Sequence, residues 1–328
     1  MIIIEKEEKH MRDKMNYQDT LSNLSGLIDE YWNDYAAHRI LSFVVNPSIP
    51  IIWFGNLEAY CNSSVRVVTI GLNPSNGEFL DSNKTKKKKD ETASYSPSFR
   101  FYKAKDLVAK SKLLKVDKDK LIESYNDYFN PNNSYDWFSN FETVFGYFPD
   151  DVIKPVSYKT DADKAKSKQA NAAIHIDFKT ALATDPTWGE LNRAYKNATS
   201  KKKEKTEQND SEKLKDILKL PEIIRKDLFE KLLHIIAPDI ILFSQAEEYL
   251  KEFTNEDDRI GEPQKIEERE DGTKYKQNEY KRMIFDADGS LLIYESYGNC
   301  GPFGLTKEKD RKEKFSNLIR DQQKIWQK

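Results

Sequence analysis

The stretch VRVVTIGLNPSNGEF, which runs from Val65 to Phe79, joins an apolar segment directly to a polar loop. The apolar part ends at Ile70 and is rich in β-branched residues, which is typical of a buried β-strand. The loop Gly-Leu-Asn-Pro-Ser that follows lacks the glycine spacing of a dinucleotide-binding fingerprint and the Gly-Lys-Ser/Thr of a phosphate-binding loop. Two interpretations stay open: a turn in which Asn73 bonds its own backbone, or a loop in which Pro74 stiffens the chain and the Asn73 amide faces a pocket.

Length and composition narrow the classes of protein to consider. The chain has 328 residues, 38% of them hydrophobic, which is enough for a real core in one large domain or two modest ones. Two distant cysteines, Cys61 and Cys300, give neither a disulfide framework nor a metal-ligand spacing. No segment is long and apolar enough for a signal peptide or a membrane span. We therefore expect a soluble cytoplasmic protein without a metal or other cofactor.

The charge of the chain is balanced overall but uneven along the sequence. There are 53 basic and 55 acidic residues, for a formal net charge of −2. Residues 84–120, however, hold thirteen Lys or Arg against five Asp or Glu. Such a window predicts either a solvated loop or a basic face that binds an acidic partner.

Strand and helix patterns alternate along the chain, which predicts an α/β fold with a largely parallel sheet. Strands are expected at residues 49–55, 65–70 and 171–178, in the first part of 237–253, which continues into a helix, and on both sides of an Asp-Ala-Asp-Gly turn at 286–289. Helices are expected at 20–45, 135–148 with Ser134 as the N-cap, 188–198, 214–236 and from 307 onward. We expect one domain over residues 49–305, with a helical extension at 1–48, a charged insertion near 199–213 and a C-terminal helix at 306–328 packed on the same domain.

Three of the expected strands end in polar residues, at Gly71–Asn76, Asp177–Thr184 and Tyr297–Gly304. Ligands of parallel α/β sheets bind at the carboxyl ends of the strands, so these ends are expected to converge. The second strand, AIHIDF, alternates where a doubly covered parallel strand should be uniformly apolar, and it puts His175 and Asp177 on one face. A buried carboxylate needs a partner, so Asp177 either caps local backbone or serves a site. For His175, a satisfied core histidine is the alternative to a site role.

The order of these segments resembles the uracil-DNA glycosylase superfamily. GLNPS is similar to the first active-site motif of its mismatch-specific branch, and IHIDFKTALATDPTW looks like the second strand of the family. In that strand Asp177 stands where the family typically has an Asn that reads the base. YGNCGPFG falls where the family places its second motif, whose loop probes the minor groove, but the His-Pro-Ser of many members is absent and Asn299 stands there instead. The resemblance covers roughly residues 50–305.

The resemblance implies a three-layer α/β/α sandwich that flips a base out of DNA and hydrolyses its N-glycosidic bond. Its catalytic residues would be Asn73, which positions the water, Asp177, which holds the base, and Asn299. Base-binding residues would be Gly71, Leu72, Pro74, Ser75, Phe79, Phe99, Phe101 and His175, with the aromatic rings stacking on the base. DNA-binding residues would be Lys84, Lys86, Lys87, Lys88, Lys89 and Arg100 on phosphates, and Phe303 and Leu305 at the tip of the second-motif loop.

The departure at Asp177 bears on the substrate. An ionised carboxylate only accepts hydrogen bonds, which suits the N4 amino group of cytosine. The resemblance then implies a bacterial antiviral enzyme that excises a derivative such as glucosylated hydroxymethylcytosine from double-stranded phage DNA, acting as a monomer. Three alternatives stay open: an ordinary uracil or mispaired-thymine glycosylase, a catalytically silent nucleic-acid-binding protein, and a small-molecule nucleoside hydrolase. The basic window is excessive for the third.

Overall fold

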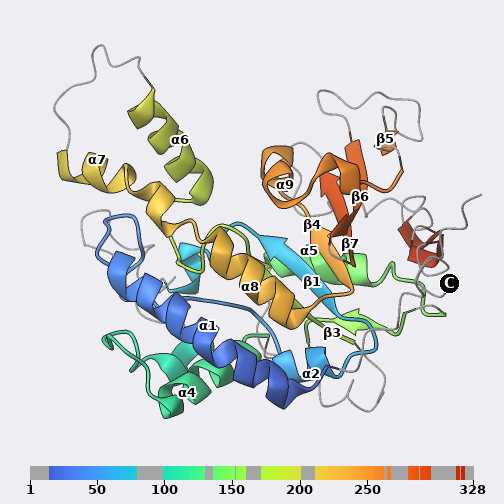
Figure 1. Cartoon of the computed structure of the whole chain (residues 1–328), viewed down its shortest axis with the longest axis horizontal. Helices are drawn as coiled ribbons and strands as arrows, with labels where there is room; N and C mark the ends of the chain where they lie inside the picture. Colours follow the sequence, from blue (N-terminus) through green and yellow to red (C-terminus); the bar gives the residue numbers. More distant parts are fainter. Residues whose placement is uncertain are drawn as a thin grey trace, which may run out of the picture.

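A computed structural model gives the fold of the chain (Figure 1). The structure describes residues 15–79, 99–129, 136–151, 153–159, 171–200, 211–261, 264–266, 280–287, 289–296, 315–317 and 319–321.

The described strands form one sheet in the order β2-β3-β1-β4-β7-β6-β5. The strands are β1 (Val67–Gly71), β2 (Val156–Ser157), β3 (Asn171–Asp177), β4 (Ile240–Phe243), β5 (Gln264–Ile266), β6 (Tyr280–Ala287) and β7 (Ser290–Ser296). All neighbours from β2 to β7 in this order are parallel, whereas β6 and β5 are antiparallel to their neighbours. The prediction of an α/β fold with a largely parallel sheet is therefore confirmed.

The centre of the sheet is formed by β1, which lies between β3 and β4. Every residue of β1 and β3 is buried, as expected for parallel strands covered on both faces. The parallel register sets Thr69 opposite His175 and Gly71 opposite Asp177. Because alternate residues of a strand share a face, these four side-chain positions lie on the same side of the sheet.

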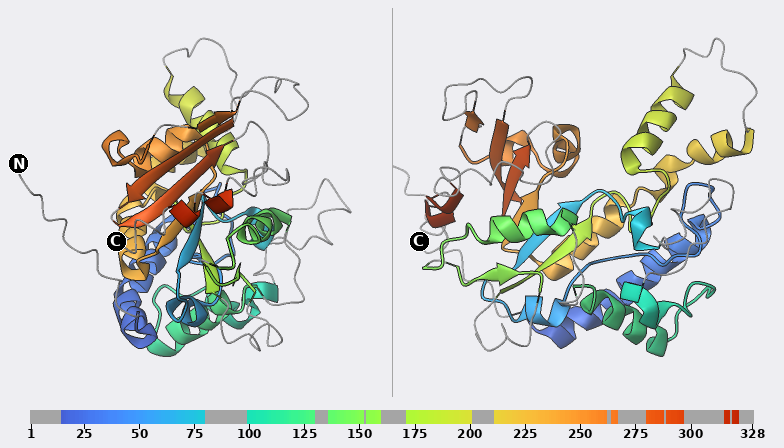
Figure 2. Two further views of the ribbon diagram at one scale, coloured as in Figure 1. Left: turned by 90° about the vertical axis from the view of Figure 1, so that its right-hand side faces the viewer. Right: turned by 180° about the vertical axis from the view of Figure 1, so that it is seen from behind.

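Helices cover both faces of this part of the sheet. The α-helices are α1 (Tyr17–His38), α2 (Leu57–Cys61), α4 (Lys115–Asn126), α5 (Asp136–Phe145), α6 (Trp188–Thr199), α7 (Ser211–Ile217), α8 (Lys226–Ile236) and α9 (Glu247–Phe253). The 3₁₀ turns are η1 (Asn76–Glu78), η2 (Phe99–Ala104), η3 (Leu220–Ile223) and η4 (Glu256–Asp258). In Figure 1, α1 and α8 lie side by side in front of the sheet, and the reverse view in Figure 2 shows α5 in front of β1 and β3.

After β1 and after β3, the chain continues on opposite faces of the sheet. The segment after β1 leads to α5, whose Phe138 ring lies 5.0 Å from that of His175 on β3. The segment after β3 leads to α8, whose Phe229 packs against Phe178 with ring centroids 5.2 Å apart. Loops that diverge in this way leave room for a ligand at the carboxyl ends of the strands.

The terminal segments pack against the same core. α1 buries one face that includes Leu24, Ile28 and Tyr35, as the periodicity of the sequence predicts. Near the other end, Phe315 is fully buried and its ring lies 5.5 Å from that of Phe148. Among the described residues, no helix has both the length and the apolar character that a membrane crossing requires.

Two expected elements differ from those observed. The helix predicted over residues 214–236 is divided into α7, η3 and α8, because Pro221 falls in its middle and cannot continue an α-helical hydrogen-bond ladder. The strand predicted over residues 49–55 pairs with β3 at a single residue, Phe54, opposite His175. Gly55, with φ 115°, turns the chain away immediately afterward.

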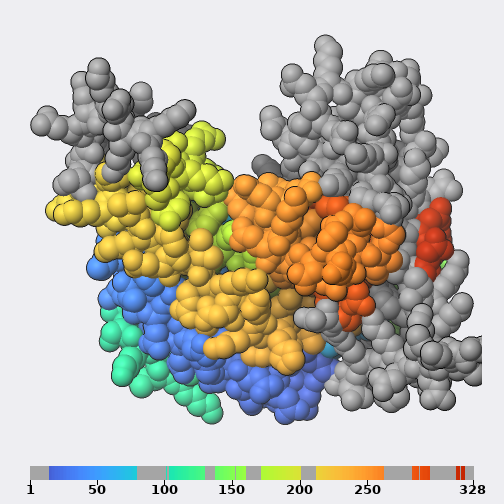
Figure 3. Space-filling model, turned by 45° about the horizontal axis from the view of Figure 1, so that its top comes forward, coloured from blue at the N-terminus to red at the C-terminus, as the bar shows by residue number. Residues whose placement is uncertain are grey.

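The helices α6 and α7 project from the body of the molecule. In the space-filling view they form the yellow-green and yellow lobe beside the orange segments around α9 (Figure 3). At the base of this lobe, Asn192 of α6 donates to the Tyr249 hydroxyl of α9 at 3.3 Å. The charged stretch near 199–213 thus lies largely between the ends of α6 and α7, and residues 201–210 are outside the described residues.

Candidate functional site

The polar ends of β1 and β3 lie side by side, as the sequence predicts. Phe178 N–H donates to the carbonyl of Gly71, and Lys179 N–H donates to the carbonyl of Leu72, both at 2.9 Å. These bonds extend the pairing of the strands into the loops that follow them. The third predicted strand end, Tyr297–Gly304 with Asn299, Phe303 and Leu305, lies outside the described residues.

A buried histidine and carboxylate face each other at this edge. His175 Nε2 lies 3.5 Å from Asp177 Oδ1, and the two side chains are 4% and 3% exposed. The second carboxylate oxygen, Asp177 Oδ2, is buried and has no hydrogen-bond partner in the described part of the chain. Burying an ionised carboxylate oxygen without a hydrogen bond costs folding free energy. Asp177 Oδ2 is therefore an acceptor that lacks a donor in the described part of the chain.

The other side of the histidine ring is held by two hydroxyl groups. His175 Nδ1 lies 2.8 Å from Thr69 Oγ1, which is in turn hydrogen-bonded to the hydroxyl of Tyr158. If His175 is neutral with its proton on Nε2, each group in the series Tyr158, Thr69, His175 donates to the next, and His175 donates to Asp177. Sequence analysis missed Thr69 and Tyr158, because their hydroxyls meet the site only through tertiary packing.

Burial raises the pKa of Asp177, and the neighbouring His175 offsets only part of this effect. The folded protein therefore keeps the Asp177 proton to higher pH than the unfolded chain does. The stability that the neutral acid contributes is fully present below the unfolded pKa and is lost as the pH rises through the raised folded pKa.

Replacing Asp177 by Asn, which does not titrate, removes this loss of stability at high pH. Asp177→Asn is expected to be more stable than the wild type at alkaline pH, by about 1–3 kcal/mol, which is the cost of an unsatisfied buried polar group. The difference should shrink as the pH falls toward the unfolded pKa of about 3.9. Urea unfolding of both proteins across this range measures it. A variant less stable than the wild type at every pH would show that Oδ2 is paired in solution.

At position 71, next to the Asp177 carboxylate, there is no room for a side chain, so the position requires glycine. A Cβ at Gly71 would lie 2.3 Å from Asp177 Oδ1 and 2.8 Å from His175 Nε2. Contacts shorter than 3.0 Å do not occur for real Cβ atoms, and both neighbours are themselves buried. Sequence analysis selected Gly71 as a base-binding residue through its motif, and this role stays a prediction. The structure gives a steric reason for glycine at this position.

The amide of Asn73 has a fixed orientation. Its Nδ2 donates to the carbonyl of Pro74 and to Thr184 Oγ1, both at 2.9 Å. The Thr184 hydroxyl donates to the carbonyl of Pro186 at 3.0 Å, so only its lone pairs are available to Asn73. Because both neighbours are acceptors, the NH2 group must face them, and Asn73 Oδ1 accepts no hydrogen bond from the described residues. The Asn73 amide is thus hydrogen-bonded both to its own loop, at Pro74, and to Thr184 in the segment after β3.

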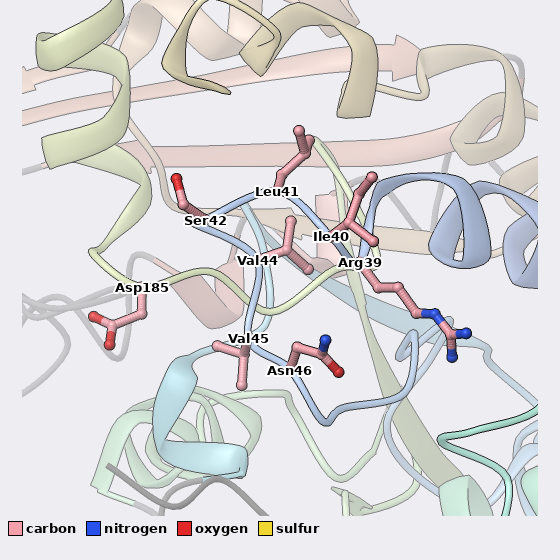
Figure 4. Close-up of a pocket in the computed structure, with 8 residues that line it drawn as sticks. All are labelled: Arg39, Ile40, Leu41, Ser42, Val44, Val45, Asn46 and Asp185. Atoms are coloured by element: carbon pink, nitrogen blue, oxygen red, sulfur yellow. The ribbon is translucent and has the colours of Figure 1, made fainter. Parts of the chain in front are cut away.

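Thr184 was not selected from the sequence, yet it joins three segments. It makes β-bridges with Val44 on one side and Ser75 on the other. On the Val44 side, a surface pocket of about 310 Å³ is lined by residues 39–42, 44–46 and Asp185 (Figure 4). Neither Asn73 nor Asp177 lines this pocket.

Phe79 and Phe101 are core residues in this structure. Their rings stack at a centroid distance of 5.8 Å, and both are fully buried. Phe101 also contacts Tyr128, which contacts Phe54, which contacts His175. The predicted stacking of these two rings on a base stays a prediction, and in the conformation described neither ring is accessible to a base.

The remaining predicted base-binding residues shape the loop after β1. Leu72 is partly buried against the core, and Pro74 is buried. Ser75 is exposed, and its hydroxyl accepts from Gly77 N–H at 3.1 Å, which caps η1. Phe99 lies in η2, where the structure describes its backbone only.

The basic window divides into two parts. Lys84 and Lys86–Lys89 lie outside the described residues, and Arg100 is described in its backbone only. In the described part, four lysines are paired with carboxylates of the chain itself: Lys103 with Glu123 and Asp127, Lys110 with Asp117, Lys118 with Asp29, and Lys120 with Asp106. These four ammonium groups are engaged by carboxylates of the chain, and the phosphate contacts expected of Lys84, Lys86–Lys89 and Arg100 stay a prediction.

Sequence analysis did not single out Trp137, which lies in the first turn of α5. Its ring lies 4.8 Å from that of His175, and the residue is 36% exposed. The available signal was the aromatic density of this helix, which is equally typical of core packing. No group of three His, Cys, Asp or Glu side chains in the described ranges is placed to hold a metal ion.

Comparisons with protein-family models, with curated proteins and with solved structures found no match to this chain.

Proposed function

We propose that this chain is a DNA N-glycosylase that removes a cytosine derivative. The observation that supports this most strongly is the buried Asp177 Oδ2, an acceptor without a donor at the carboxyl end of a central parallel strand. The exocyclic N4 amino group of cytosine is a donor of the required kind. A base that inserted this group would satisfy the carboxylate and relieve the cost of its burial.

The hydrolysis would use the loop after β1. The fixed amide of Asn73 leaves Oδ1 free to accept a hydrogen bond from a water molecule. The N1–C1′ bond would break with its electron pair going to the base, the water oxygen would bond to C1′, and the water proton would leave to the base or the solvent. Positive charge develops on the sugar in such a reaction, as in other glycoside hydrolysis.

The proposal extends to the partner and the biological setting. A base in a duplex must be flipped out before a buried carboxylate can reach it. We propose modified double-stranded phage DNA, carrying a base such as glucosylated hydroxymethylcytosine, as the substrate of a monomeric cytoplasmic enzyme in antiviral defence. Lys84 and Lys86–Lys89 are the phosphate contacts of this proposal, and Asn299, Phe303 and Leu305 are its contacts near the minor groove. The three-layer α/β/α sandwich of the superfamily is part of the same proposal.

One observation favours a second candidate, uracil. Burial raises the pKa of Asp177, and a protonated carboxyl group can donate its O–H to O4 of uracil while its carbonyl accepts from N3–H. The pH dependence separates the two candidates. Uracil excision would fall as the pH rises through the pKa of Asp177, because only the neutral acid donates, whereas the ionised acid still accepts from N4 of cytosine.

The proposal is tested with duplex oligonucleotides that carry one uracil, cytosine, hydroxymethylcytosine or glucosylated hydroxymethylcytosine. Abasic sites are scored by alkaline strand cleavage. Asn73→Ala is expected to lower the rate by roughly 10²–10⁴, the range for loss of one group that directs a proton transfer, with little change in the Kd for DNA. Asn76→Ala, in the same loop, is the matched control and should keep the wild-type rate.

Two outcomes contradict the glycosylase. Tight DNA binding without abasic sites from any of the four duplexes would favour the silent nucleic-acid-binding protein. Equal rates for the wild type and Asn73→Ala would remove Asn73 from the chemistry, because no step would then depend on its free carbonyl oxygen.

A further inference from the structure

A series of buried polar side chains stands behind the Asp177 carboxylate. Tyr158, which directly follows β2, is hydrogen-bonded through its hydroxyl to Thr69 Oγ1 of β1, and Thr69 Oγ1 lies 2.8 Å from His175 Nδ1 of β3. On the other side of the imidazole, Nε2 lies 3.5 Å from Asp177 Oδ1. All four residues are buried. Each contact in the series holds one proton, so the direction of one bond constrains the direction of the next.

The end of the series at Tyr158 fixes this direction. In the part of the chain that the structure describes, Thr69 is the single hydrogen-bond partner of the Tyr158 hydroxyl. If Thr69 donated to Tyr158, the Tyr158 O–H would be buried without an acceptor, which costs free energy. Burial raises the pKa of Tyr158, so the phenol keeps its proton at neutral pH. Tyr158 is therefore the donor, and Thr69 Oγ1 accepts from it.

The positions of the remaining protons follow. Because Thr69 accepts from Tyr158, the Thr69 proton is directed to His175 Nδ1, which must then be unprotonated. A neutral imidazole without a proton on Nδ1 carries it on Nε2 and donates it toward Asp177 Oδ1. The reverse direction leaves one buried hydroxyl unpaired, which disfavours the other tautomer of His175 by roughly 5- to 150-fold.

The surroundings of the imidazole supply no other ionisable partner among the described residues. The groups that face it are Asp177 on its own strand, Thr69 and Gly71 of β1, Tyr158, and the rings of Phe54, Trp137 and Phe138. Of these, Asp177 and Tyr158 titrate. The carboxylate of Glu142 lies beyond the series, where it accepts from the backbone N–H of Tyr158.

We infer that Thr69 and Tyr158 are positioning residues, which hold His175 as a hydrogen-bond donor to Asp177 Oδ1 and leave Oδ2 as the atom that takes up a proton. With Oδ1 already accepting from His175, a proton that Asp177 binds resides on Oδ2. This inference rests on the proposed function only where Oδ2 is assigned to a base. There, the ionisation of Asp177 decides whether Oδ2 accepts from a cytosine derivative or donates to uracil.

Nuclear magnetic resonance measures the tautomer directly, through long-range proton–nitrogen correlations of protein labelled at its four histidines. His175→Phe identifies the signals of His175. The wild type is expected to carry the proton on Nε2, and this spectrum tests the inference even if a variant does not fold. Thr69→Val keeps the shape of the side chain and removes the donor to Nδ1, so the tautomer ratio should fall by roughly 5- to 150-fold.

Two further variants control for a merely structural effect of Thr69→Val. Thr69→Ser retains the hydroxyl and should restore the wild-type tautomer ratio. Thr143→Val makes the same change at an exposed position of α5, where the hydroxyl bonds the carbonyl of Ser139, and should leave the His175 signals unchanged.

The pH profile of excision gives a second readout that a loss of stability would not produce. In the wild type, excision of the cytosine derivative should fall as the pH drops through the raised pKa of Asp177, because Oδ2 then carries a proton. In Thr69→Val, Asp177 can instead place its proton on Oδ1, facing an unprotonated Nε2, and Oδ2 remains an acceptor. The fall in rate should therefore occur at lower pH in Thr69→Val than in the wild type or Thr69→Ser.

The outcomes keep the inference apart from the proposed function. A wild-type His175 with its proton on Nδ1, or a tautomer ratio that Thr69→Val does not change, overturns the inference even if abasic sites form. The expected tautomers in a protein that forms no abasic site from any duplex uphold the inference and overturn the glycosylase. Identical pH profiles for the wild type and Thr69→Val overturn the assignment of the proton to Oδ2.

Discussion

Asp177→Asn is expected to lower the excision of a cytosine derivative by roughly four orders of magnitude, the discrimination seen when a buried polar site faces the wrong hydrogen-bonding partner. His175 Nε2 lies beside Oδ1, where a donated hydrogen bond would hold the carbonyl oxygen of the substituted amide. The NH2 group would then occupy the place of Oδ2 and present a donor to the base. Such a donor opposes the N4 amino group of cytosine and suits O4 of uracil.

Single-turnover rates on the four duplexes measure this exchange of preference. The wild type is expected to leave uracil intact, and Asp177→Asn is expected to lose the cytosine derivative and gain some activity on uracil. His175→Phe in the same background is the control, because without the imidazole the amide can rotate and the preference for uracil should weaken. Robust excision of uracil by the wild type, unchanged in Asp177→Asn, would overturn both the role of Asp177 and the choice of substrate.

Gly71→Ala is expected to abolish detectable excision and to lower stability by about 1–3 kcal/mol, the usual cost of overpacking a core. The added methyl group would lie 2.3 Å from Asp177 Oδ1, so the carboxylate must move away from the position it holds beside His175. Thermal unfolding and the excision assay together measure the two effects. Gly189→Ala is the matched control, since a Cβ there meets nothing within 4 Å.

A double-mutant cycle shows whether the carboxylate is the cause. Combined with Asp177→Ala, the Gly71→Ala change should cost much less stability, because the atom at 2.3 Å is gone and only the His175 ring remains close. Additive costs in the cycle would instead place the strain in the backbone of β1.

The sequence predicted the elements of the sheet better than their contacts. The strands β1, β3 and β4 and the hairpin of β6 and β7 follow from apolar runs and turn residues, and the common face of His175 and Asp177 follows from the two-residue period of a strand. The meeting of Asp177 with Gly71 depends on the register between β1 and β3, which local patterns do not encode.

Contacts between residues far apart in the sequence could not be predicted, because local patterns do not encode them either. Tyr158 reaches Thr69 across 89 positions, and Thr184 reaches Asn73 across 111. Local patterns also could not show which aromatic rings lie in the core, and Phe79 and Phe101, which were selected for base stacking, are fully buried. The lysines of the basic window look free in sequence, and one partner, Asp29 of α1, lies 89 positions away from Lys118.

The two polar groups of the site have separate supports. Asp177 is held from β3 by His175, with Thr69 and Tyr158 behind it, whereas Asn73 is held by Pro74 and Thr184. In the proposed glycosylase, a substitution around the carboxylate would therefore change which base is bound without disturbing the amide that is proposed to direct the water. Under the proposed function, such a layout would let base specificity evolve by small steps in a lineage exposed to viruses that alter the modification of their DNA, while the residues proposed for hydrolysis stay unchanged.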